Sequence, residues 1–167
     1  MTDHNYSNIC KECGGYCCTQ GGSTATKLEV DRVIEAGYPN KFIEITENCY
    51  VTDFGEDLIC PYLKESTCEI YLVRPLLCRK YPIFSTDGEE HYLVHCPLTQ
   101  YLTKDDLAQC IAAALEVSEE LFTSVQRFMA PFGSRIDERM RKFKMERIEL
   151  NEKDGAEGEM CSNSGKS

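Results

Sequence analysis

Apolar residues recur at intervals of three and four positions between about residues 103 and 150 of this 167-residue chain. This spacing predicts helices that each bury one face. Thr103, with Asp106 three residues later, predicts the capped start of a first helix, and Ser118 predicts the start of a second. A third helix is expected from about Ser134. The side chains expected to face inward are Leu107, Cys110, Ile111, Ala114, Leu115, Leu121, Val125, Phe128, Phe132, Ile136, Met140, Phe143 and Leu150.

The first hundred residues have a different pattern, with only short periodic segments among many Gly, Pro, Tyr and Cys residues. Gly and Pro end a helical segment, and alternating apolar residues predict strands. These segments are too few to bury much core, so we expect a bound metal to contribute to stability. The expected elements are a helix at 27–36, extended segments at 42–45 and 50–54, and a hairpin that joins 83–84 to 92–94 across Asp87 and Gly88.

These patterns together predict an α+β fold. Residues 1–102 form a small irregular cysteine-rich metal-binding region with short strands, and residues 103–150 form a group of about three helices packed on it. Residues 151–167 are small, polar and acidic, which predicts a disordered tail. The length and the hydrophobic content of 42% suit one compact domain and are too small for two ordinary ones.

The formal net charge of -10 disfavours non-specific binding to nucleic acid or to an anionic membrane, because both need clustered Lys and Arg. We therefore expect neither partner. Residues 135–147 are a local exception, with six basic against three acidic residues. We interpret them as a solvated helix face with mixed ion pairs, and a protein partner for the helical region stays open.

Eight of the eleven cysteines stand in a pattern typical of a thiolate metal site. A Cys-x2-Cys pair aims two sulfurs at one ion, and the other sulfurs can arrive from distant loops. Two of the later cysteines each precede a proline, whose fixed φ holds the loop in place. The candidate ligands are Cys10, Cys13, Cys17, Cys18, Cys60, Cys68, Cys78 and Cys96.

A disulfide framework is the alternative to a metal site. Residues 1–8 contain no apolar run typical of a signal peptide, and no stretch approaches the roughly 18 apolar residues of a membrane span. We therefore expect a cytoplasmic protein, where thiols stay reduced. The odd number of cysteines also argues against complete pairing. The pattern thus favours metal over disulfides.

The N-terminal cluster leaves one question open. Gly14 and Gly15 allow the chain to turn back so that Cys17 can join the first pair. Cys17 and Cys18 are adjacent, and neighbouring side chains diverge in extended backbone. Either the two sulfurs bind two nearby metals, which we favour, or one binds metal and the other is a buried free thiol.

The remaining candidates are weaker. Arg74 and Arg79 lie close in sequence to Cys68 and Cys78 and can offset the negative charge of a thiolate centre. Cys49 could be a ligand or not. We expect no ligand role for Cys110, on a helix face, for Cys161, in the expected tail, or for His4, His91 and His95.

Several motifs occur in a familiar order: Cys10-x2-Cys13-x3-Cys17-Cys18, Cys60-Pro61-Tyr-Leu63, Cys68-Glu-Ile-Tyr71, Arg74-Pro75-x2-Cys78-Arg79-x-Tyr81-Pro82 and Cys96-Pro97. Together they resemble the YkgJ-type cysteine-cluster family, a zinc- or iron-chelating domain of CxxCxxCC type, over about residues 10–98. The family's usual spacing is Cys-x2-Cys-x2-Cys-Cys, and this chain has one extra residue before Cys17. The resemblance implies a metal centre. Members are commonly described as metal-chelating or iron-sulfur proteins, and bacterial flagellin lysine methylases contain a similar pattern.

We therefore expect a cytosolic metal-binding protein with an all-cysteine centre and no assigned catalysis. An iron-sulfur cluster is favoured over Zn2+, bound as one or two ions, and thiolates suit both. The alternative is an iron-sulfur-dependent redox or protein lysine methyl-transfer enzyme, or a subunit of one. That alternative is disfavoured because the chain lacks a Gly-rich nucleoside-binding loop after a strand.

Overall fold

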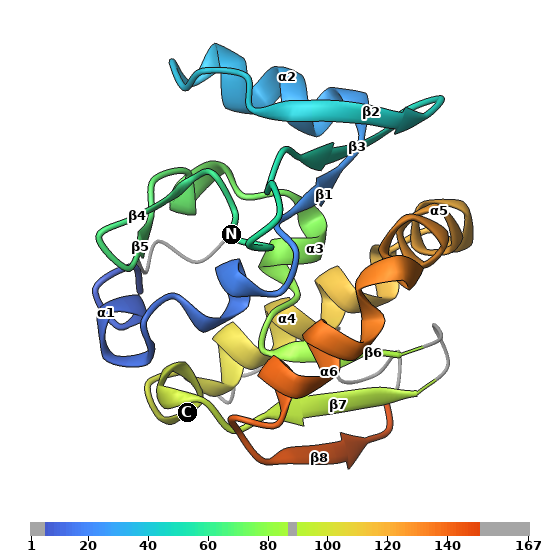
Figure 1. Ribbon diagram of the computed structural model, residues 1–167. Helices are drawn as coiled ribbons and strands as arrows, with labels where there is room; N and C mark the ends of the chain where they lie inside the picture. Colours follow the sequence, from blue (N-terminus) through green and yellow to red (C-terminus); the bar gives the residue numbers. More distant parts are fainter. Residues whose placement is uncertain (1–5, 87–89, 151–167) are drawn as a thin grey trace, which may run out of the picture.

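The computed structural model describes residues 6–86 and 90–150 (Figure 1). Short strands and turns dominate the N-terminal part and longer helices follow, so the expected α+β class is confirmed. In chain order the elements are α1 (Cys10–Cys13), η1 (Tyr16–Thr19), β1 (Thr24–Ala25), α2 (Lys27–Glu35), β2 (Phe42–Thr46), β3 (Cys49–Thr52), β4 (Leu63–Lys64), β5 (Thr67–Cys68), η2 (Tyr71–Val73), α3 (Leu76–Arg79), β6 (Ile83–Ser85), β7 (His91–Val94), η3 (Pro97–Gln100), α4 (Lys104–Glu116), α5 (Glu119–Met129), η4 (Ala130–Phe132), α6 (Gly133–Met140) and β8 (Met145–Ile148).

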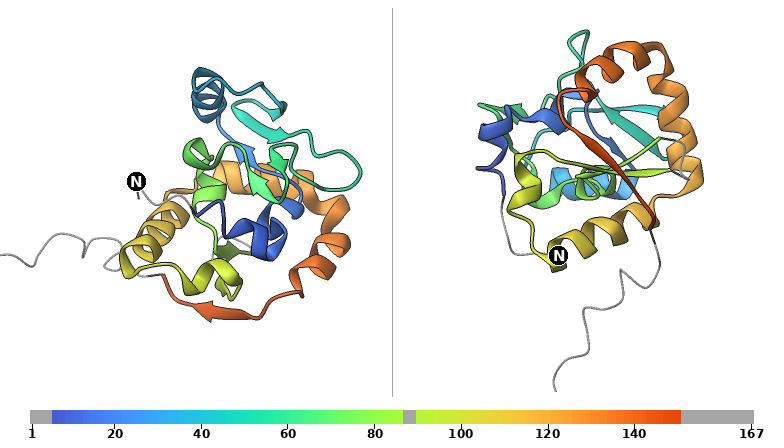
Figure 2. Two further views of the ribbon diagram at one scale, coloured as in Figure 1. Left: turned by 90° about the vertical axis from the view of Figure 1, so that its left-hand side faces the viewer. Right: turned by 90° about the horizontal axis from the view of Figure 1, so that it is seen from below.

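Three small antiparallel sheets organise the molecule, with strand orders β1-β3-β2, β4-β5 and β6-β7-β8. The first sheet, with α2, lies at one end in Figure 1, and the third sheet lies at the other. Between them lie α1, the β4-β5 hairpin and α3, which carry four of the eight candidate ligands (Figures 1 and 2). The expected hairpin is confirmed, because Ile83 pairs with Leu93 and Phe84 with Tyr92. Its predicted turn residues, Asp87 and Gly88, lie outside the described residues.

The predicted helix starts are confirmed. Thr103 and Asp106 form a capping box at the start of α4, in which each side chain accepts a hydrogen bond from the other's backbone N–H. The Ser118 hydroxyl accepts from Leu121 N at the start of α5. In Figure 2 the helices α4, α5 and α6 follow one another around the periphery of the domain. None of the helices in the described part of the chain is long and apolar enough to cross a membrane.

The third predicted helix is only partly correct. It ends at Met140, and the chain then forms β8, which pairs with β7. Phe143 and Leu150, which helical spacing placed on one inward face, instead pack into two different clusters beside β7. Long-range pairing with β7 therefore overrides the local helical period of this segment.

The N-terminal region buries more core than its periodicity predicts. Seven residues form one buried cluster there, and Leu58 is fully buried in a second cluster that α5 and α6 help to cover. Several of these side chains come from loops, where no period could identify them. The buried members of the first cluster are Ala25, Val30, Val33, Phe42, Cys60, Tyr62 and Ile70.

Candidate metal centre

The N-terminal cysteine segment doubles back on itself through two glycines. Gly14 and Gly15 have φ angles of 70° and 71°, in the left-handed region that glycine adopts without strain. At Gly15 an added Cβ would also meet the side chain of Leu63. The turn joins Cys10, on α1, to Cys17, on η1, and Gly15 N donates to Cys10 O at 2.8 Å. The expected role of this glycine pair is therefore confirmed.

Four thiols from three segments form the innermost group. The thiol of Cys18 lies close enough to those of Cys17, Cys60 and Cys68 to interact with each of them. The backbone supports this arrangement, because Cys60 N donates to Cys18 O at 2.7 Å. These interactions raise the pKa of Cys18 and lower those of the other three. The protonation of each of the four thiols therefore depends on the other three.

Two further thiols adjoin this group. Burial raises the pKa of Cys10 to about 12, and the nearby Cys17 and Cys13 add to the effect. Burial also raises the pKa of Cys78, whose charge interacts with Cys60, Cys68 and Cys17. The Cys78 thiol donates to the Ser23 hydroxyl at 2.9 Å. We call the following six side chains the sulfur group: Cys10, Cys17, Cys18, Cys60, Cys68 and Cys78.

The other two predicted ligands pack in a neighbouring hydrophobic cluster, and Cys13 also lies near Cys10. Cys96 is buried with Tyr16 and Val94, and Cys13 packs against the same hydrophobic cluster. The Cys13 thiol donates to Cys10 O at 3.4 Å. Within the described residues, no hydrogen bond joins Cys96 to the sulfur group. The structure therefore brings six of the eight candidates together and leaves Cys13 and Cys96 beside them.

Two tyrosines connect these environments. Burial raises the pKa of Tyr16 to about 12, and both Cys96 and Cys17 contribute. Burial and the same two cysteines also raise the pKa of Tyr81. The Tyr81 hydroxyl lies near Cys96 but makes no hydrogen bond of normal geometry within the described part of the chain. Neither tyrosine was singled out by the sequence, although Tyr81 belongs to the Arg-Pro-x2-Cys-Arg-x-Tyr-Pro motif.

Arg74 supplies the positive charge beside the sulfur group. Its guanidinium stacks on Tyr71, 3.7 Å from the ring centre, and its Nε donates to Tyr71 O at 2.9 Å. Burial alone would lower the pKa of Arg74, but Tyr71 and the thiols of Cys78, Cys17 and Cys68 outweigh it and raise the pKa. The predicted placement of Arg74 is confirmed. Arg79 is oriented differently, with its Nη2 3.8 Å from Glu29 Oε1.

The remaining candidates lie elsewhere. Cys49 is buried in β3, and its thiol lies near Thr46 and Ser124 and not in the sulfur group. Cys110 is buried on α4, and its thiol donates to Tyr81 O at 3.5 Å. His91 pairs with Ser85, and His95 pairs with Glu146 in the third sheet. His4 and Cys161 lie outside the described residues.

The chemistry of the sulfur group suits a soft metal, although its geometry is not that of a formed site. Thiolates are preferred by zinc, Cu(I) and iron-sulfur clusters, and a nearby guanidinium offsets their charge. Among the described residues, no three Cys, His, Asp or Glu side chains already surround a point where an ion would fit. The thiols are packed against one another instead. Metal binding would replace these sulfur–sulfur contacts and release thiol protons.

Comparison with known proteins supports this interpretation. A family model named CxxCxxCC and described as "Putative zinc- or iron-chelating domain" matches residues 9–107, which is more than half of the chain. The matched range contains the sulfur group, Cys13, Cys96 and Arg74. No curated protein and no solved structure gives a significant match.

Proposed function

This chain belongs to the CxxCxxCC family, and we propose that it is a metal-binding protein whose centre is held by cysteines alone. The observation that carries the proposal is the sulfur group, in which loops distant in sequence bring six thiols beside the buried face of Arg74. A buried free thiol stabilises a protein core no more than an aliphatic side chain of similar size does. Burial alone therefore gives no reason for so many cysteines at this place. A metal makes the same arrangement stabilising, because each thiolate then forms a bond.

We assign the inner ligands to Cys17, Cys18, Cys60 and Cys68, because the Cys18 thiol interacts with each of the other three. Cys10 and Cys78 adjoin them and are the next candidates. A two-metal arrangement with eight ligands would also require Cys13 and Cys96, which pack in the neighbouring cluster. We therefore propose six sulfurs as the ligand pool and give the other two a supporting role.

We place an iron-sulfur cluster ahead of zinc. Zinc sites in proteins draw on imidazole and carboxylate as well as thiolate, whereas most iron-sulfur clusters are held by thiolates alone. The two histidines in the described part of the chain are both paired elsewhere, with Ser85 and Glu146. Zn2+, as one or two ions, is the alternative metal.

Anaerobic purification followed by elemental analysis and a visible absorption spectrum tests the proposal. Iron with inorganic sulfide and a brown colour supports the cluster, and a colourless protein with bound zinc supports the alternative. Protein without either metal, with its thiols paired in disulfides, would overturn the proposal.

A further inference from the structure

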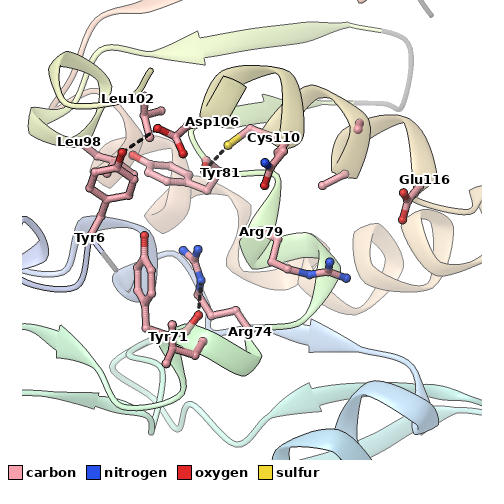
Figure 3. Close-up of a pocket in the computed structure, with 14 residues that line it drawn as sticks. Tyr6, Tyr71, Arg74, Arg79, Tyr81, Leu98, Leu102, Asp106, Cys110 and Glu116 are labelled. Carbon is pink, nitrogen blue, oxygen red and sulfur yellow. Dashed lines mark hydrogen bonds between the residues drawn. The ribbon is translucent and has the colours of Figure 1, made fainter. Parts of the chain in front are cut away.

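A pocket shares Arg74 with the sulfur group. It has a volume of about 230 Å³ and lies between η2 and α3 on one wall and α4 on the other (Figure 3). Such a volume lies below the usual range for drug-sized ligands and far below the needs of a dinucleotide. The pocket therefore suits only a small molecule.

One wall of the pocket carries two guanidinium groups. Arg74 is held from behind by its stacking on Tyr71 and its Nε bond to Tyr71 O. Within the described residues, its terminal nitrogens have neither a hydrogen-bond acceptor nor a carboxylate partner. The buried Nε of Arg79 also lacks an acceptor there, and the ion pair of Arg79 with Glu29 is loose, at 3.8 Å. Figure 3 shows the Arg74 guanidinium beside Tyr71 and the Arg79 side chain further along the wall, extending toward the end of the pocket where Glu116 lies.

The carboxylates of the pocket do not cancel these charges. Asp106 accepts from the Tyr6 hydroxyl at 2.6 Å and from the backbone and side chain of Thr103. These hydrogen bonds hold the Asp106 carboxylate at the start of α4. Glu116 is exposed at the far end of the pocket, as Figure 3 shows. A dianion would meet repulsion from both carboxylates, whereas a single carboxylate can lie against the arginine wall.

The rest of the lining is aromatic or apolar. Tyr71 and Tyr81 present their rings, and Leu98, Leu102 and Ala113 complete the surface. An apolar body can pack against these side chains while its charged end faces Arg74 and Arg79. Arginine is well suited to such a ligand, because its planar fork donates two parallel hydrogen bonds to one carboxylate.

We propose that this pocket binds a small monocarboxylic acid with an aromatic or branched apolar body. Its carboxylate is held by Arg74 and Arg79, and its body packs among Tyr71, Tyr81 and the leucines. The inference stands independently of which metal the sulfur group binds. Because Arg74 contacts both sites, a bound carboxylate lies next to the metal centre.

Isothermal titration calorimetry on the full-length protein as purified tests this site, with benzoate as the probe. Benzamide, which has the same shape and no charge, and inorganic phosphate are the comparison ligands. We expect benzoate to bind about tenfold or more tightly than either, which is the range for a charge-assisted hydrogen bond. Equal binding of benzamide would overturn the arginine contact, and tighter binding of phosphate would overturn the carboxylate assignment.

Three variants locate the binding. Arg79→Gln should weaken benzoate about tenfold. Ala112→Leu should block the pocket while keeping α4 helical, because Ala112 lines the pocket and Leu is a good helix former. Arg135→Gln on α6 removes the same charge outside the pocket and should leave affinity unchanged. Absence of benzoate binding to the wild type, or wild-type affinity in both Arg79→Gln and Ala112→Leu, would refute the site.

Discussion

The basic C-terminal segment holds the cysteine segment in place through Arg139. The Arg139 guanidinium on α6 donates to Thr19 O at 2.6 Å and to Asp57 O at 2.8 Å. These carbonyls lie close in sequence to Cys18 and Cys60, so one side chain ties together two ligand-bearing segments. Each hydrogen bond from a charged donor contributes about 1.5–3 kcal/mol when buried. Because Arg139 is half-buried, we expect Arg139→Gln to lower the free energy of unfolding by about 1–2 kcal/mol in total.

This loss corresponds to a fall in melting temperature of about 2–8 °C for a domain of this size. Urea denaturation and thermal melting, at equal metal content, measure it. Arg135→Gln is the matched control, because Arg135 is an exposed arginine on the same helix. It should change stability by no more than about 0.5 kcal/mol. Equal stability of the two variants would refute the role of Arg139.

Three further predictions follow from buried groups. Tyr62→Phe should cost about 0.5–1.5 kcal/mol in denaturation experiments, because it removes the part-buried hydrogen bonds of the Tyr62 hydroxyl to Pro39 O and from Lys41 N. An unchanged midpoint would contradict this. Burial lowers the pKa of Lys80 from 10.5 to about 8, so the unfolded chain binds more protons between these values. Stability should therefore rise with pH across that window, and Lys80→Met should remove this contribution. Zn2+ added to metal-free protein at pH 7 should release protons, because the Cys10 thiol is protonated at that pH and loses its proton when it binds metal. A pH-indicator assay that shows no proton release would count against Cys10 as a metal ligand.

Elements defined by neighbouring residues could be predicted from the sequence. The capping box of Thr103 and Asp106 and the start of α5 at Ser118 depend on contacts three residues apart, and both are present. The strand β8 was missed because its stability comes from β7, about fifty residues earlier. Tyr62 and Leu58 are fully buried from irregular segments, where no periodicity identifies the inward face.

The cysteine pattern identified the chemistry of the candidate centre but not its internal arrangement. Spacing favoured Cys10, Cys13 and Cys17 as neighbours, and the structure places Cys17 and Cys13 near Cys10. Spacing did not show that Cys18 groups with Cys17, Cys60 and Cys68. This grouping depends on how the loop before β4 packs on η1, which is a tertiary property. Ser23 was also missed, because its bond to Cys78 joins residues 55 positions apart.

Metal content of four serine variants, measured in parallel with the wild type after anaerobic purification, tests the central claim most directly. Cys60→Ser and Cys78→Ser replace soft thiolates of the sulfur group with hydroxyls and should lose most of the metal. Cys96 and Cys110 lie outside the group, so Cys96→Ser and Cys110→Ser should bind the same amount of metal per protein as the wild type. Loss of metal in Cys96→Ser, together with its retention in Cys60→Ser, would contradict the proposed grouping. A wild-type protein without zinc or iron would contradict the metal centre itself.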